Sequence, residues 1–269
     1  MCHCHGPRPS TTQPPTLGRR RFTALLLGGA SLPALAACDP AGVGELFVSE
    51  DQIEQLGLET WERIREEEPR STNEANREKA RAMTARILSA VDEDPDAWEV
   101  EVFAGDQANA WVLPGKRMGI YDGMFAMAED DDQLAAVIGH EIGHDQAEHA
   151  RQRVAREIGT QATLQLVSTA LQIGDIAYAN QIAGLFGAGA QYGIILPYSR
   201  EQELEADEIG LTNMARAGYD PEGAIRLWRN MAEQPSPPTF ASTHPAPEGR
   251  IQALEAMLPE ARAIYEAAT

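Results

Sequence analysis

Cysteine is scarce in this sequence, and all three cysteines, Cys2, Cys4 and Cys38, lie within the first 38 of its 269 residues. If the segment before Cys38 is removed, the rest of the chain can form no internal disulfide bond, even in an oxidising compartment. Basic residues are scarce too, since 22 Lys and Arg stand against 41 Asp and Glu, for a formal net charge of −19. This charge repels phosphate groups, so nucleic acid is excluded as a partner.

Long hydrophobic runs are also missing. The run from Phe22 to Ala37 follows three arginines and is too short to anchor a protein permanently across a bilayer, so it is typical of a signal peptide. Leu35-Ala36-Ala37-Cys38 resembles the box of bacterial lipoproteins, in which the signal is cut before a cysteine that is then lipidated. GRRRF at 18–22 resembles a twin-arginine export signal, although the basic start of an ordinary secretory signal explains it equally well.

These features predict three segments along the chain. Residues 1–37 are a signal peptide, Cys38 is the lipidated start of a tether that reaches residue 48, and residues 49–269 are a single domain. The predicted location is the bacterial cell envelope, on the periplasmic side, with attachment to the membrane through Cys38. Asp39 beside this cysteine favours the inner membrane, by a rule that holds in enteric bacteria. The sequence does not indicate an oligomeric state.

The remaining sequence contains helical patterns around a short run of strands. Apolar periodicity predicts helices over about 49–68 and 73–91 and strands over 98–103, 110–113 and 118–121. Capping and acidic residues predict that later helices begin near Asp130, Ser199, Pro221 and residue 248. The Ala/Gly/Leu-rich residues 159–197 are interpreted as buried helix, with a membrane-contacting surface as the alternative. The predicted fold class is α+β, mainly helical with a small β-sheet.

Three of the six histidines lie in the segment VIGHEIGHDQAEH at 137–149. On a helix, His140 and His144 point the same way one turn apart, so their ring nitrogens can bind one cation. Glu141 lies about 100° further round the helix, where it can reach a water on the open side of a metal. The pattern H-E-x-x-H therefore predicts two zinc ligands and the general base of a peptidase.

A catalytic zinc site of this kind needs a third protein ligand. The metzincin spacing is excluded, because Ala147 and Ala150 occupy the positions of its glycine and histidine. His149 faces elsewhere on a straight helix, which favours a packing or hydrogen-bonding role. A third ligand from the same helix, such as Glu148, is geometrically awkward. The acidic segment SREQELEADEIG at 199–210 is the better source.

Together the two segments resemble peptidase family M48, the zinc metallopeptidases of the HtpX, BepA and LoiP type and the CAAX prenyl protease. That family pairs HExxH with a downstream helix reading Ser-Arg-x-x-Glu-x-x-Ala-Asp. The resemblance implies a zincin-like domain with one Zn²⁺ bound by His140, His144 and Glu203, and with Asp207 orienting a ligand through a hydrogen bond. The neighbouring acids are interpreted as a solvated face: Glu201, Glu205 and Glu208.

Two further segments carry the same resemblance. Asn109-Ala110 with Leu113-Pro114-Gly115 resembles a family segment that forms an edge strand along the cleft, which implies that Asn109 and Ala110 hold extended substrate. Ser242-Thr243-His244-Pro245 with Arg250-Ile251 resembles another. It implies that His244 either stabilises the oxyanion of the reaction or caps the metal until substrate arrives. Arg250 either contacts substrate or forms a structural ion pair.

The resulting hypothesis is an exported, membrane-anchored zinc metalloendopeptidase with Glu141 and His244 as catalytic residues. Its predicted substrates are polypeptides, in particular unfolded or misassembled envelope proteins. The alternative is a zinc-containing chaperone or assembly factor of the cell envelope with little or no turnover. A purely structural zinc site is a third interpretation, but such a site has no need of a base beside the metal.

Overall fold

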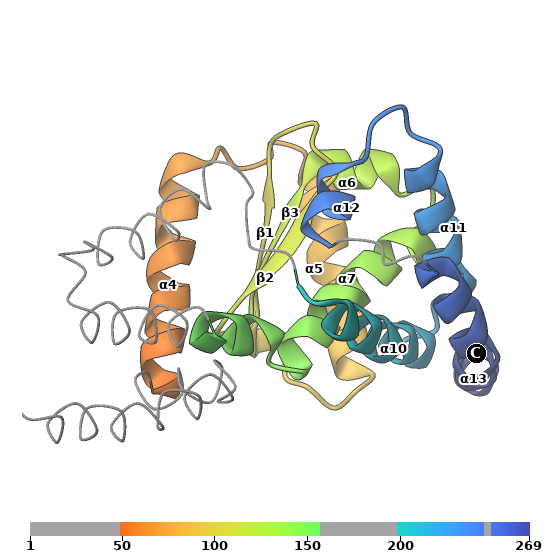
Figure 1. The fold of residues 1–269 in the computed structure, drawn as a ribbon. Coiled ribbons are helices and arrows are strands. Elements are labelled where there is room, and N and C mark those ends of the chain that lie inside the picture. Colours follow the sequence, from red (N-terminus) through yellow and green to blue (C-terminus); the bar gives the residue numbers. More distant parts are fainter. Residues whose placement is uncertain (1–48, 157–197, 245–248) are drawn as a thin grey trace, which may run out of the picture. The chain divides into compact units, whose positions relative to one another are not determined.

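The computed structural model describes residues 49–156, 198–244 and 249–269, and Figure 1 labels their helices and strands. These residues all belong to one compact unit, Pro40–Thr269. The predicted signal peptide, Cys38 with its tether, and the segment 159–197 lie outside the described residues, so those interpretations stay predictions.

Two helices open the described part of the chain. α4 (Glu50–Glu67) begins at a capping box, in which the Ser49 side chain accepts a hydrogen bond from the Gln52 backbone and the Gln52 side chain binds the Ser49 backbone. α5 (Glu74–Ser89) begins at Asn73, whose side chain accepts from the Asn76 backbone. Both helices bury an apolar stripe, as their spacing predicts.

A three-stranded sheet follows, made of β1 (Glu99–Phe103), β2 (Ala110–Leu113) and β3 (Arg117–Tyr121). β3 lies in the middle, parallel to β1 and antiparallel to β2, with Ala110 opposite Ile120. Arg70 forms a bridge to Phe103 on the outer edge of β1. Within the described ranges, the outer edge of β2 has no strand beside it.

The two faces of the sheet pack against different helices (Figure 1). One face carries an aromatic cluster against α4, and its members are Trp61, Phe103, Trp111 and Tyr121, with Ile64 and Leu113. The other face packs into the main core with α5 and α7, through Val102, Val112, Met118 and Ile120. Neighbouring strand residues alternate between these clusters, as the two-residue period of a strand requires.

The second half of the described chain is helical. Its helices are α6 (Asp122–Met127), α7 (Asp131–Gln146), α10 (Arg200–Arg216), α11 (Glu222–Ala232), α12 (Thr239–Thr243) and α13 (Arg250–Ala268), and a short 3-10 turn, η2 (Pro95–Ala97), precedes β1. α10 begins at the predicted capping box of Ser199 and Gln202. It ends before Gly218, which has a φ of 72° that glycine adopts without strain.

α7 and α10 cross at unusually close range because small residues line the crossing. A Cβ atom on Gly143 would lie 2.7 Å from the carbonyl oxygen of Ala206, and one on Gly139 would lie 2.9 Å from that of Gly210. Any larger residue at these positions would push the helices apart. This approach lets side chains from the two helices meet in a buried site.

The fold confirms the predicted class, mainly helical with a small sheet. The observed helix and strand bounds match the expected ones to within about two residues, which is the ordinary uncertainty of such bounds. α6 and α12 were not predicted, because five or six residues are too short to show a helical period. In the part of the chain that the structure describes, no helix is both long and apolar enough to span a bilayer.

Candidate metal centre

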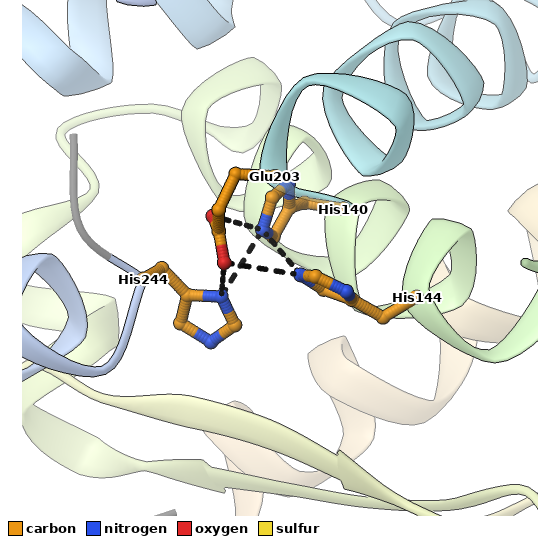
Figure 2. Close-up of side chains that lie close together, drawn as sticks. All are labelled: His140, His144, Glu203 and His244. Carbon is orange, nitrogen blue, oxygen red and sulfur yellow. Dashed lines mark hydrogen bonds and ion pairs between the residues drawn. The ribbon is translucent and has the colours of Figure 1, made fainter. Parts of the chain in front are cut away.

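Four buried side chains from three elements converge where α7 and α10 cross (Figure 2). His140 and His144 come from α7, Glu203 from α10, and His244 from the end of α12. One ligand atom from each lies within 4.8 Å of all the others. Such a set of imidazole nitrogens and one carboxylate oxygen is a donor set that zinc prefers.

The two histidines of α7 turn the same nitrogen toward the centre. His140 Nε2 and His144 Nε2 lie 3.0 Å apart. Two nitrogens that each bind zinc at about 2.0–2.1 Å with tetrahedral geometry lie about 3.3 Å apart, so little movement is needed. Glu203 closes the third side, with Oε2 3.4 Å from His140 Nε2 and Oε1 3.6 Å from His144 Nε2.

The outer nitrogen of His140 belongs to a buried charge network. His140 Nδ1 lies 3.0 Å from Asp207 Oδ1 and 3.3 Å from Arg250 Nη2. Asp207 is nearer and can only accept, so it takes the Nδ1–H of His140. Arg250 donates to both oxygens of Asp207 at 2.7 Å, and its Nη1 donates to Glu203 Oε2 at 2.7 Å. The Arg250 guanidinium therefore binds both Glu203 and Asp207, the residue that accepts from His140.

The network makes the centre attractive to positive charge. Burial alone would lower the pKa of His140, but its hydrogen bonds with Asp207 and Glu203 outweigh burial and raise this pKa to about 9. For Glu203, burial opposes ionisation, yet the hydrogen bonds with His140 and His244 hold the pKa well below its usual value. A site that favours positive charge in this way suits a bound cation.

The outer nitrogen of His144 contacts another imidazole instead of a carboxylate. Its Nδ1 lies 3.0 Å from Nδ1 of His149, and its ring stacks on Tyr198 with 3.8 Å between centroids and 19° between planes. Burial, followed by the nearby imidazoles, lowers the pKa of His144 well below its usual value. His144 is therefore neutral, which is the form that binds a metal.

His149 reaches His144 because the helix is broken between them. α7 ends at Gln146, Glu148 adopts a left-handed conformation with a φ of 54°, and residues 149–156 are again helical. On a straight helix His149 would face elsewhere, as expected, and the bend is what brings it back. His149 is not among the four converging side chains, and its contact is a hydrogen bond, in agreement with the sequence analysis.

Glu141 lies beside the centre without a hydrogen bond of its own. Its side chain is fully buried, and neither carboxylate oxygen has a hydrogen bond among the described residues. Oε1 lies 3.3 Å from His244 Nε2, within the range of an ion pair but without hydrogen-bond geometry. Burial raises the pKa of Glu141. A small cavity next to it is lined by Trp111, Val112, Glu141, Tyr198, Thr243 and His244.

Two of the residues predicted to bind substrate are buried and have partners within the chain, and their contact with substrate stays a prediction. Asn109 and Arg250 are each only 2% exposed. Asn109 Oδ1 lies 3.2 Å from the Thr243 hydroxyl, so this side chain fixes the residue before His244. Arg250 is the structural ion pair that the sequence analysis left open as its alternative. Ala110 begins β2, the edge strand, and stays a prediction as a substrate contact.

Three neighbours of the centre were missed or misjudged from the sequence. Two of them belong to no sequence motif. Tyr198 stacks on His144, and the ring of Trp228 lies 4.1 Å from the Arg250 guanidinium. Glu205 was interpreted as solvated, and its side chain is indeed 60% exposed, but it also lies 3.2 Å from Nε2 of His149. No signal on α10 predicts this contact, because Glu205 lies about 180° around the helix from the face of Glu203 and Asp207.

Several known proteins are similar to this chain. The mitochondrial metalloendopeptidase OMA1 of Schizosaccharomyces pombe is 34% identical over 61% of this chain and 48% of its own length. OMA1 of Saccharomyces cerevisiae is 29% identical over 92% of this chain and 76% of its own length. The beta-barrel assembly-enhancing protease of Yersinia pestis is 32% identical over 54% of this chain and 31% of its own length. The chain thus matches about half or less of the first and third relatives.

These relatives overturn the predicted location. The bacterial cell envelope was expected, whereas relatives from two yeasts, Arabidopsis thaliana and Homo sapiens are named as mitochondrial, so that prediction is wrong. The composition of residues 1–37, with arginines and no acid, could not distinguish the two locations, because it is typical of mitochondrial transit peptides as well as of export signals.

The family itself is settled by a match over most of the described chain. The model of Peptidase family M48 matches residues 73–258, which include both motifs and all four converging side chains. The zinc dependence of this family agrees with the donor set described above. The chain therefore belongs to peptidase family M48, the zinc metallopeptidases that the sequence motifs indicated.

Proposed function

We propose that this chain is a zinc metalloendopeptidase that hydrolyses peptide bonds in unfolded or misassembled polypeptides. His140, His144 and Glu203 bind the metal, and Glu141 is the general base. The observation that carries the proposal is the buried Glu141 carboxylate, which has no hydrogen bond of its own next to three metal-binding side chains. A buried carboxylate without a hydrogen bond is costly, and active sites are where such costs are accepted.

The chemistry divides between the metal and the chain. Zinc, when bound, lowers the pKa of a water and polarises the carbonyl of the scissile bond. Glu141 accepts the proton of the attacking water and returns it to the leaving amine. The burial that raises the pKa of Glu141 suits it to both steps, since a base must also release its proton.

The edge of β2 supports a preference for extended, unfolded chains. Its outer edge carries no strand among the described residues, and Trp111 and Val112 of this strand line the cavity at Glu141. A peptide paired with this edge is held through its main chain, which gives affinity with little dependence on side chains. The name of the Yersinia pestis relative, a beta-barrel assembly-enhancing protease, agrees with substrates that have failed to assemble.

His244 is proposed to close the centre rather than to help the reaction. Its Nδ1 lies 3.2 Å from both His140 Nε2 and Glu203 Oε1, so it stands where a fourth ligand would bind. Four protein ligands make a closed site, and a catalytic site keeps one position open. His244 must therefore move before water and substrate can enter.

The first test changes the base. Glu141→Gln should leave one zinc per chain and abolish cleavage of unfolded casein, because the amide cannot accept a proton. Glu208→Gln, an exposed change on α10, is the control and should cleave normally. Cleavage by purified Glu141→Gln at the normal rate would rule out this mechanism. A wild-type protein that binds zinc and delays aggregation of unfolded proteins without cleaving them would favour the chaperone alternative.

The second test removes the closing residue. His244→Ala should keep its zinc and cleave casein several times faster, since the fourth position is then open. A fall in turnover with unchanged zinc content would instead make His244 a stabiliser of the oxyanion.

A further inference from the structure

His149 and Glu205 form a short relay that ends on a proposed zinc ligand. His149 Nδ1 lies 3.0 Å from His144 Nδ1, and His149 Nε2 lies 3.2 Å from Glu205 Oε2. The imidazole of His149 is 1% exposed, whereas the Glu205 side chain is 60% exposed. The relay thus runs from the edge of α10 to the inner helix α7. The peptidase mechanism proposed above uses neither residue.

The chemistry of the three groups fixes the direction of both hydrogen bonds. A carboxylate can only accept, so the nitrogen of His149 that faces Glu205 carries the hydrogen. A neutral imidazole has one N–H, so Nδ1 of His149 is then bare and can only accept. The nitrogen of His144 that faces it must donate. His144 is left with its lone pair on Nε2, the atom that faces His140 and Glu203.

We infer that His149 and Glu205 are positioning residues, which hold His144 in the tautomer and ring orientation that bind the metal. This inference rests on the proposed zinc site. A ligand imidazole usually donates its other N–H to a carboxylate, a carbonyl or a water, and this partner sets the tautomer. Here the partner of His144 is the imidazole of His149, whose own tautomer is set by its hydrogen bond to the exposed carboxylate of Glu205.

The bend at Glu148 supports a dedicated arrangement. A residue other than glycine is strained in the left-handed region, yet Glu148 adopts this conformation between α7 and His149. Tyr198 packs against both rings, with centroids 3.8 Å from His144 and 6.1 Å from His149. The three rings and the bend fix one geometry for the relay.

The sharpest test replaces Glu205, which accepts the hydrogen bond of His149, with a residue that can only donate. In Glu205→Lys the ammonium can only donate, so His149 must turn its bare nitrogen outward and its N–H toward His144. His144 is then driven to the tautomer with hydrogen on Nε2, which cannot bind zinc. Glu208→Lys makes the same change in charge one turn further along α10, at an exposed residue, and is the control.

We expect the zinc affinity of the full chain, measured by competition with a chromophoric chelator, to fall about tenfold in Glu205→Lys. Glu208→Lys should stay within about threefold of wild type. The titrations are repeated at 0.15 and 0.5 M NaCl, because salt screens a simple charge effect but not a change of tautomer. Equal losses in the two variants, or a loss that high salt removes, would overturn the relay.

A second pair of variants tests the middle of the relay and needs no change in charge. His149→Asn can present an amide oxygen near the position of Nδ1, whereas His149→Leu has a similar volume and no acceptor. His149→Asn should bind zinc about tenfold more tightly than His149→Leu. Equal affinities would mean that His149 only fills space.

Nitrogen-15 NMR of the zinc-free wild-type protein reads the tautomer directly. His144 should carry its hydrogen on Nδ1, and Glu205→Lys should move it to Nε2. Hydrogen on Nε2 of His144 in the wild type would contradict the inference. These results are separable from the proposed function, because a wild-type chain that binds no zinc defeats the zinc site itself, whereas normal zinc binding with unaffected variants defeats only the relay.

Discussion

The two histidines of one motif are supported in opposite ways. Asp207, Arg250 and Trp228 form what we call the Arg250 side. There, the outer nitrogen of His140 bonds to a buried Asp207–Arg250 ion pair. His149, Glu205 and Tyr198 form what we call the Glu205 side. There, His144 bonds to His149 and stacks on Tyr198, and His149 in turn bonds to the exposed carboxylate of Glu205. Nδ1 of each histidine has a hydrogen-bond partner, but only on the Arg250 side are the charged groups of that network buried.

This difference predicts that the Arg250 side stabilises the fold, whereas the Glu205 side mainly sets the zinc affinity of His144. Two buried carboxylates share one buried guanidinium, so the Arg250 side fails as a unit if the cation is lost. The Glu205 side contains one charge that water can reach. We therefore expect changes on the Arg250 side to cost stability as well as metal, and changes on the Glu205 side to affect mainly the metal.

The largest expected effect comes from removing the shared cation. Arg250→Met leaves Glu203 and Asp207 buried without their partner, and the free energy of unfolding should fall by about 3–5 kcal/mol. Arg229→Met, which breaks the exposed pair with Glu255, is the control and should cost less than about 1 kcal/mol. Urea denaturation of both variants measures this. A loss as small as that of the control would mean that the buried pair is not the anchor.

Next in size is the loss of the carboxylate that orients His140. Asp207→Asn can turn an N–H toward His140 Nδ1 and favour the wrong tautomer, so zinc affinity should fall by about 10–100-fold. This exceeds the loss expected for Glu205→Lys, because Asp207 is buried and nearer to its ligand. Chelator competition provides the comparison. Equal losses from Asp207→Asn and Glu205→Lys would remove the contrast between the two sides.

A smaller effect is expected from the ring stacked on His144. Tyr198→Leu removes the stacking and should lower stability by about 1 kcal/mol, with a loss of zinc affinity of only a few fold. Tyr198→Phe keeps the ring and is the control for the hydroxyl group. Urea denaturation and zinc titration compare the two variants, and Tyr198→Leu should be the less stable. If the two variants had the same stability and zinc affinity, the stacking would contribute nothing.

The last effect, on stability alone and with none expected on zinc affinity, concerns the bend that brings His149 back. Glycine adopts a positive φ freely, whereas a β-branched residue does so at a cost, so Glu148→Val should be less stable than Glu148→Gly by about 1 kcal/mol or more. Thermal unfolding of the two variants gives the difference. If valine were tolerated as well as glycine, the bend would not depend on this residue, and the Glu205 side would be less rigid than the structure implies.

Much of the centre was predictable because its signals are local in sequence. The four-residue spacing of His140 and His144 fixes their common direction on any helix, and the capping box of Ser199 fixes where the helix of Glu203 begins. The small residues at 139, 143 and 210 could not be interpreted alone, because their meaning lies in the helix that each faces. Asn109 was assigned to a segment by resemblance, but its hydrogen-bond partner, Thr243, is 134 residues away and could not be predicted from that segment.

The amino-acid sequence by itself determined most of the helices and strands, the H-E-x-x-H motif and the family, because each depends on spacing within one element or on a short run of residues. The tertiary structure alone decided that Arg250 is buried, that His244 lies beside His140 and Glu203, and that Glu205 reaches the motif through His149. These facts depend on how closely α7 and α10 approach and on where the chain bends at Glu148. Such distances arise from packing between distant segments, which no local pattern records.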